Sequence, residues 1–219
     1  MRKDFDIIEK ERVYRENGLD AKKDVGFEST GLDIQEAKLR TIQYFPSLAS
    51  VVKNFTFQND GSGTEGGVAC TDTKSIIKLN AVLLSSAGIE AAVDIIAHEA
   101  LHTEESAEGL LGNIASDGVI NARLRASGRS MKLGGIDIPN AIQMGTQAIY
   151  AFLNKAIGYV NSVTGSSPDA DSNSHEFTRE EVISACYGNY ALWARLVNWV
   201  KTKDKEKTQS AQPELALVF

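Results

Sequence analysis

The chain has 219 residues and a net charge of −6, and its 42% hydrophobic and 24% charged residues are ordinary for a soluble globular protein. The acidic balance argues against binding along nucleic-acid phosphates, which needs clustered cations. No apolar run reaches the roughly 18 residues that a membrane-spanning helix requires. The charged N-terminus lacks the apolar core of a secretory signal, and two cysteines are too few for a disulfide framework, so a cytoplasmic setting is expected.

The first part of the chain predicts a charged extension, a helix and a small sheet. Residues 1–31 are charged and interrupted by glycines, which indicates an N-terminal extension. Residues 32–45 have apolar positions at helical spacing, and residues 55–57 read as the start of a strand. Residues 68–70 and 75–79 flank a Thr-Asp-Thr-Lys turn, which predicts a β-hairpin.

The remainder of the chain has a helical pattern until near residue 201. Thr178 and Glu181 fit a capping box at the start of the last helix. The lysine-rich sequence KTKDKEK is a solvated charge run that opens a C-terminal tail, 201–219. A helix-dominated α+β fold is expected, with one domain over residues 32–200. The expected helices are 89–107, 113–127, 139–162 and 178–201.

Two of the three histidines lie four residues apart in the sequence His98-Glu-Ala-Leu-His102. On a helix this spacing puts both imidazoles on one face, where they can hold one zinc ion in a tetrahedral shell. Glu99 is turned by about 100° around the helix axis, so it lies beside the position that a water takes rather than among the ligands. A carboxylate there can accept a proton from a water that attacks a carbonyl. The motif therefore predicts a catalytic zinc site with Glu99 as general base.

A catalytic zinc usually has a third protein ligand. With a turn expected near residues 109–110, His102 and Asp117 lie about seven residues on either side of it, and such residues are level in an antiparallel helix pair. Asp117 is therefore the expected third ligand. Asp94 and Glu105 flank the histidine face and are expected to orient the imidazoles, and Glu105 is the competing ligand.

Other reactive side chains have simpler interpretations. His175 is expected to be an exposed loop histidine, and the alternative is a donor to an oxyanion or part of a lid. Cys70 is expected to pack as a small apolar residue. A short basic stretch is interpreted as a solvated helix end rather than a nucleic-acid site, because cations favour helix C-termini. It contains Arg123, Arg125, Arg129 and Lys132.

Three segments occur in an order that resembles one family. They are TDTKSIIKLN at 71–80, HEALH at 98–102 and NIASDGVINARL at 113–124. Together they resemble the zinc metallopeptidase domain that precedes a von Willebrand A-like domain in many bacterial proteins. Residues 177–182 (FTREEV) also resemble a later helix start in that family. The last of the three segments distinguishes this family from other proteins with HExxH.

The resemblance implies a zincin-like fold with His98 and His102 as zinc ligands, Glu99 as base and Asp117 as the family's aspartate. Two features differ from the family pattern. No further histidine follows the motif at residues 106–108. The chain is also expected to be a stand-alone version, without the von Willebrand A-like half.

A zinc-dependent hydrolase is the expected function, and a peptidase acting on a peptide or protein is its expected form. No nucleic-acid or membrane partner is expected, and the sequence makes no prediction of oligomeric state. The alternative is a non-catalytic structural or interaction protein that retains a zincin-like fold, with or without structural zinc. A shell closed by four protein ligands would favour that alternative.

Overall fold

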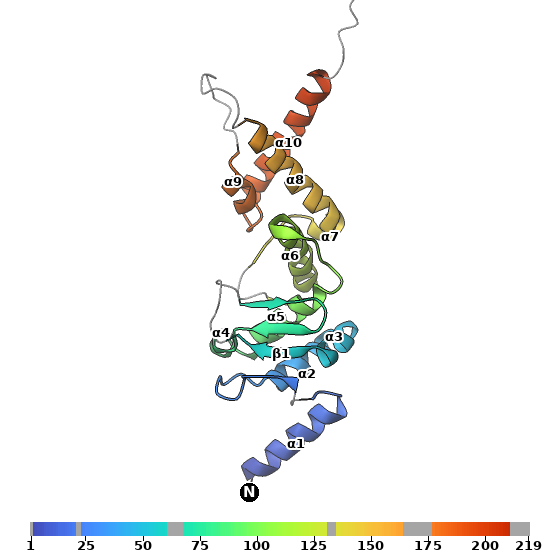
Figure 1. The fold of residues 1–219 in the computed structure, drawn as a ribbon, viewed down its shortest axis with the longest axis vertical. Coiled ribbons are helices and arrows are strands. Elements are labelled where there is room, and N and C mark those ends of the chain that lie inside the picture. Colours follow the sequence, from blue (N-terminus) through green and yellow to red (C-terminus); the bar gives the residue numbers. More distant parts are fainter. Residues whose placement is uncertain (1, 21–22, 61–67, 131–134, 164–176, 211–219) are drawn as a thin grey trace, which may run out of the picture. The chain divides into compact units, whose positions relative to one another are not determined.

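A computed structural model describes residues 2–20, 23–60, 68–130, 135–163 and 177–210 (Figure 1). These residues form a helix-dominated structure with a small mixed sheet, which confirms the α+β class. The strands are β1 (Thr56–Asn59), β2 (Ala69–Thr71) and β3 (Ile76–Leu79). The helices are α1 (Arg2–Glu16), α2 (Ile34–Tyr44), the 3-10 turn η2 (Pro46–Leu48), α3 (Ala49–Asn54), α4 (Ala81–Ala87), α5 (Ile89–Leu101), α6 (Gly109–Ala126), α7 (Ala141–Met144), α8 (Thr146–Val163), α9 (Arg179–Ser184) and α10 (Tyr190–Ser210).

The sheet has the strand order β1-β3-β2. Strands β2 and β3 are antiparallel, with Ala69 opposite Leu79, so the predicted hairpin is confirmed. Strand β1 runs parallel to β3. The side chains of Phe57, Ile77 and Leu79 are fully buried, which is why these short strands are held to the core on one face.

The chain divides into two compact units. The first contains residues 1–106 and 123–135, and the second contains residues 107–122 and 136–219. Helix α6 therefore contributes its first residues to the second unit and its last turn to the first. This division differs from the single domain expected over 32–200.

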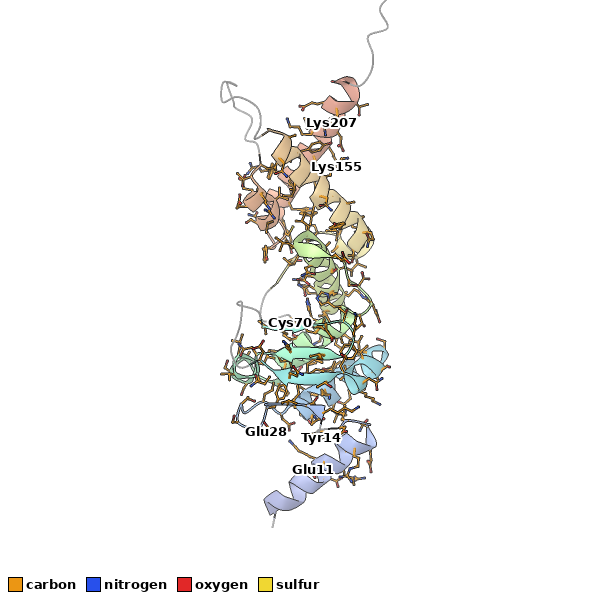
Figure 2. All side chains as sticks on the ribbon, viewed as in Figure 1. Glu11, Tyr14, Glu28, Cys70, Lys155 and Lys207 are labelled. Atoms are coloured by element: carbon orange, nitrogen blue, oxygen red, sulfur yellow. The ribbon has the colours of Figure 1, made fainter. Side chains whose placement is uncertain are left out.

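The first unit packs α2 against α5, and α5 in turn packs against strands β2 and β3. Part of the predicted extension belongs to this core, since Leu19 and Phe27 are buried. Tyr14, labelled in Figure 2, also contributes through a hydroxyl that donates to Asp33 at 3.2 Å. Residues before the expected boundary at 31 thus form part of the folded unit.

A buried ion pair joins the chain before α2 to this core. Lys38 Nζ lies 2.9 Å from Asp24 Oδ2, and both side chains are almost fully buried. Asp24 also accepts a hydrogen bond from the backbone N–H of Phe57 at 3.0 Å. The pair is stabilised because the carboxylate has several donors, as a buried charge requires.

The second unit has a continuous apolar core formed by helices α6, α8, α9 and α10. Leu153 on α8 and Leu196 on α10 are both buried in this core. Aromatic contacts add to this core, including Phe152 with Trp193 at a centroid distance of 5.2 Å. The apolar periodicity of both helices accounts for their packing.

Glycines divide two of the predicted helices. The helix expected over 139–162 is interrupted by Gly145, and the one expected over 178–201 is interrupted near Gly188. Both glycines have φ of 75°, a left-handed conformation that ends a helix and that other residues adopt at a cost. The capping box predicted for Thr178 and Glu181 is confirmed at the start of α9.

Two helix ends also differ from expectation. Helix α5 ends at Leu101, before the expected end at 107. Helix α10 continues to Ser210, so the lysine-rich run at 201–207 is helical and does not open the tail. Charged residues in that run alternate in sign, and an exposed helix accommodates them readily. Within the described residues, no helix is both long and apolar enough to cross a membrane.

Candidate metal centre

Helix α5 carries the HExxH motif and is almost entirely buried. It begins after Gly88, whose φ of 94° separates it from α4. Val93, Ile96 and Ala97 are fully buried, so the helix is fixed in the first unit. His98 lies in its last turn and His102 is its C-cap residue. Because His102 keeps helical angles (φ −62°, ψ −16°), the one-turn relation between the two histidines is preserved.

The two imidazoles point their Nε2 atoms at each other. His98 Nε2 lies 3.2 Å from His102 Nε2, and the rings are close to perpendicular at 75°. Two nitrogens bound to one tetrahedral zinc at about 2.0–2.1 Å would lie about 3.3 Å apart. The pair therefore already has the separation that a shared zinc ion requires.

A backbone carbonyl fixes the orientation of the second ring. His102 Nδ1 lies 3.3 Å from the backbone oxygen of Glu105. A carbonyl oxygen only accepts hydrogen bonds, so Nδ1 carries the proton and Nε2 keeps its lone pair. This is the tautomer that binds a metal through Nε2, and a partner of this kind commonly supports metal-bound histidine.

Asp117 lies on α6, and its neighbours explain how that part of the helix is held. Gly118 follows it, and a Cβ at that position would come within 2.9 Å of the Ile138 side chain. One turn later, the buried amide of Asn121 donates to the backbone oxygen of Ile136 at 3.0 Å. The Asp-Gly-x-x-Asn pattern thus combines a candidate ligand with two residues that fix its helix to the following chain.

His98, His102 and Asp117 together form a group that can hold a metal ion. One ligand atom from each lies within 4.8 Å of the others, and all three residues are half-buried. Ligand atoms of a tetrahedral zinc lie about 3.4 Å apart, so the carboxylate would need to move inward by at most about 1.4 Å. Two nitrogens and a carboxylate oxygen are a donor set that suits zinc. The residues present therefore fit the ion.

Glu105 contacts His102 through its backbone oxygen and Arg123 through its carboxylate. The metal-binding group found among the described residues does not include it. Its carboxylate lies 3.5 Å from Arg123, while its backbone oxygen contacts His102. Glu105 thus orients an imidazole as predicted, but through its main chain.

Asp94 lies one turn before His98, and its contact with an arginine was not foreseen. Arg129 Nε donates to its carboxylate, and Arg129 Nη2 also lies 2.9 Å from Glu90. Burial lowers the pKa of Arg129 while its hydrogen bonds to these two carboxylates raise it, with a net rise. Asp94 therefore anchors α5 through Arg129, which the sequence places in a basic stretch interpreted as a solvated helix end.

Glu99 is the acidic residue nearest in sequence to both histidines. It lies on α5 and is 7% exposed, among the most buried charged residues of the described chain. A buried carboxylate beside a metal-binding group has the placement expected of a general base. The other residue with a candidate catalytic role, His175, lies outside the described residues.

The spacing argument that selected Asp117 used a helix boundary that the structure corrects. Residues 102–108 separate α5 from α6, so His102 lies at the start of that connection and Asp117 lies well inside α6. The two residues are therefore not equidistant from the turn. Sequence alone could not place this boundary, because the helix stops at Leu101 despite an uninterrupted helical pattern.

Two arginines of the basic stretch form ion pairs with acidic neighbours. Arg123 pairs with Glu104 at 3.1 Å, and Arg129 pairs with Glu90 and Asp94. Ion pairs of this kind reduce the positive field that phosphate binding requires.

Searches with protein-family models, among curated proteins and among solved structures found no match to this chain.

Proposed function

We propose that this chain is a zinc-dependent hydrolase of zincin-like type that cleaves a peptide or protein. The observation that carries the proposal is the opposed pair of Nε2 atoms, 3.2 Å apart, with Asp117 in the same group. The resemblance of residues 71–80, 98–102 and 113–124 to the bacterial metallopeptidase domain supports the same reading.

In this proposal each residue has a distinct task. His98, His102 and Asp117 hold the ion, and the Glu105 carbonyl keeps the His102 ring in its metal-binding tautomer. When bound, zinc supplies Lewis-acid chemistry, which polarises a carbonyl and makes water a stronger acid. Glu99 accepts a proton from the attacking water and then donates it to the leaving nitrogen.

An open position on the ion distinguishes this function from a structural zinc site. The group found in the described chain has three members rather than four, which leaves a place for water. All three are half-buried, so solvent reaches them. These two features favour catalysis over a closed, purely structural centre.

The first test measures metal content and hydrolysis together. Purified protein loaded with zinc should retain about one ion per chain by elemental analysis, and His98→Ala should lose it. Zinc-loaded wild-type protein should cleave labelled casein or members of a fluorogenic peptide library. Failure of the wild-type chain to retain zinc would refute the metal site itself.

The second test separates metal binding from proton transfer. Glu99→Gln should retain zinc and folding and should lose activity by about 100-fold or more, the usual contribution of a general base. Glu108→Gln is the matched control, because Glu108 is an exposed glutamate of the chain between α5 and α6. Full activity of Glu99→Gln would remove Glu99 from the mechanism, and zinc retention without hydrolysis in the wild-type protein would favour a structural site.

A further inference from the structure

The second unit contains an apolar groove whose lining includes none of the metal-binding residues. It has a volume of about 680 Å³ and lies along α8 and α10, with residues 139–144 at one end. Phe152 and Trp193 line it and also pack in the apolar core of this unit. Ala151 and Ala194 line it too, and both are exposed, so the groove opens to solvent. A mainly apolar pocket of this volume is typical of a site for a small molecule.

The face of α10 that lines the groove changes from apolar to charged along the helix. Trp193 and Val197 begin this face, and Lys201 and Asp204 follow at spacings of four and three residues. Residues at these spacings lie on one side of a helix. Helix α8 changes in the same way, because the last of its lining residues is Lys155, whose Nζ lies 2.7 Å from Asp204. The groove therefore has an apolar end and a charged end.

The charged end carries more cations than anions. Asp204 accepts hydrogen bonds from Lys155 and from the hydroxyl of Tyr159, and these bonds lower its pKa, so its charge is already compensated. Lys207 lies over the Tyr159 ring, 4.4 Å from its centroid, and Figure 2 labels Lys155 and Lys207. Lys201 lines the groove and is exposed, and no carboxylate of the described chain forms an ion pair with it. An anionic group is the complement of this end.

The length of the groove sets the size of its ligand. On α10 the lining residues run from Trp193 to Asp204, a distance of about 16 Å at about 1.5 Å per residue. An extended hydrocarbon advances about 1.3 Å per carbon, given C–C bonds of about 1.5 Å. A straight chain of about 12 carbons therefore spans this distance.

We propose that this groove binds a single-chain carboxylate of the fatty-acid type, with about 12 carbons. The carboxylate accepts hydrogen bonds from Lys201 Nζ and from the side-chain amide of Asn198, which also lines the groove. The hydrocarbon lies over Phe152 and Trp193 and runs toward residues 139–144. Burial of the apolar chain supplies most of the affinity, and the cationic end fixes the direction in which the chain lies.

The first experiment titrates the full-length chain with straight-chain carboxylates in an isothermal calorimeter, each below the concentration at which it forms micelles. Dodecanoate should bind with a stoichiometry of one. From hexanoate through octanoate to dodecanoate, the affinity should rise by about two- to four-fold per added methylene, because each methylene buries apolar surface. It should level off at hexadecanoate, whose last carbons extend beyond the groove. Absence of dodecanoate binding, or an affinity that rises just as steeply up to hexadecanoate, would overturn the proposal.

A second experiment tests the charged end. Octanoate should bind about two- to five-fold more tightly than 1-octanol, the range expected for an exposed ion pair. Lys201→Glu should remove this preference and leave the affinity for 1-octanol unchanged. Lys205→Glu is the matched control, because Lys205 is an exposed lysine of α10 that does not line the groove. Equal effects of the two variants on octanoate would contradict the assignment of Lys201.

A third experiment fills the groove from its exposed side. Ala194→Trp should weaken dodecanoate binding by about ten-fold or more, because the indole takes the volume of the ligand. Ala191→Trp is the matched control, since Ala191 is an exposed alanine of α10 that does not line the groove, and far-UV circular dichroism should show equal helix content in both variants. Unchanged dodecanoate binding by Ala194→Trp would place the ligand elsewhere and overturn the proposal. A wild-type dimer in light scattering that Ala194→Trp dissociates would assign the groove to a second copy of the chain instead.

Discussion

Arg129 is expected to determine the stability of α5, the helix that carries the HExxH motif. Its guanidinium is 11% exposed and contacts the carboxylate of Asp94, which is 3% exposed. It also donates to the backbone oxygen of Glu90 at 3.0 Å and lies over the Tyr44 ring, 4.6 Å from the centroid. We predict that Arg129→Met strongly destabilises α5, because methionine keeps an apolar stem and removes only the charge and its donors.

The expected loss follows from the burial of Asp94. Removing one partner of a buried ion pair leaves the other charge uncompensated and typically costs about 3–5 kcal/mol. The hydrogen bonds to Glu90 contribute less, since its side chain is 39% exposed. Stacking on Tyr44 adds about 0.5–1 kcal/mol. The double variant Arg129→Met with Asp94→Leu should recover most of the stability, because no charge is then buried alone.

Hydrogen exchange measures this effect where it arises. A loss of about 3 kcal/mol in the local opening free energy should speed exchange of α5 amides by roughly 100-fold or more. Arg123→Met is the control, because Arg123 is 38% exposed and its partner Glu104 is 48% exposed, so about 1 kcal/mol or less is expected. If the two methionine variants accelerated exchange equally, the assignment of Arg129 as the anchor of α5 would be wrong.

Two further predictions concern groups away from the site. Burial raises the pKa of the Cys186 thiol to about 12, so this thiol stays protonated at pH 8. A thiol reagent should therefore modify only the exposed Cys70 in the native protein, and it should modify both cysteines after denaturation. In denaturant titrations, Lys38→Met should lower the free energy of unfolding by about 3–5 kcal/mol, because it leaves the buried carboxylate of Asp24 without its cation. Lys10→Met is the control, because Lys10 is 59% exposed in its ion pair, and it should change the free energy of unfolding by less than about 1 kcal/mol.

The sequence predicts the local geometry of the site well because that geometry follows from one helical turn. Two histidines four residues apart face the same side of any regular helix, and His98 and His102 do so here. The β-hairpin and the Thr178 capping box are equally local, since each depends on a few adjacent residues. Such features need no knowledge of the rest of the fold.

The features that sequence reasoning missed depend on contacts between distant residues. Arg129 reads as one of several cations near a helix end, and only the fold brings it to Asp94, which lies 35 positions earlier in the chain. Gly145 and Gly188 interrupt predicted helices, and each has a positive φ of 75° there. A glycine within an apolar helical pattern is compatible with continuation or with a break, and tertiary contacts decide between them.

The support of His102 comes from a backbone atom, which a comparison of side chains does not identify. Sequence reasoning compares side chains, so it selected the carboxylate of Glu105. Helix α5 instead ends at Leu101, and the chain that follows brings the carbonyl of Glu105 to the imidazole Nδ1. A carbonyl oxygen is present at every residue, and its position depends on where the helix stops. The tautomer of His102 is therefore set by the end of α5, so a substitution of the Glu105 side chain that preserves this backbone leaves the ring oriented for metal binding.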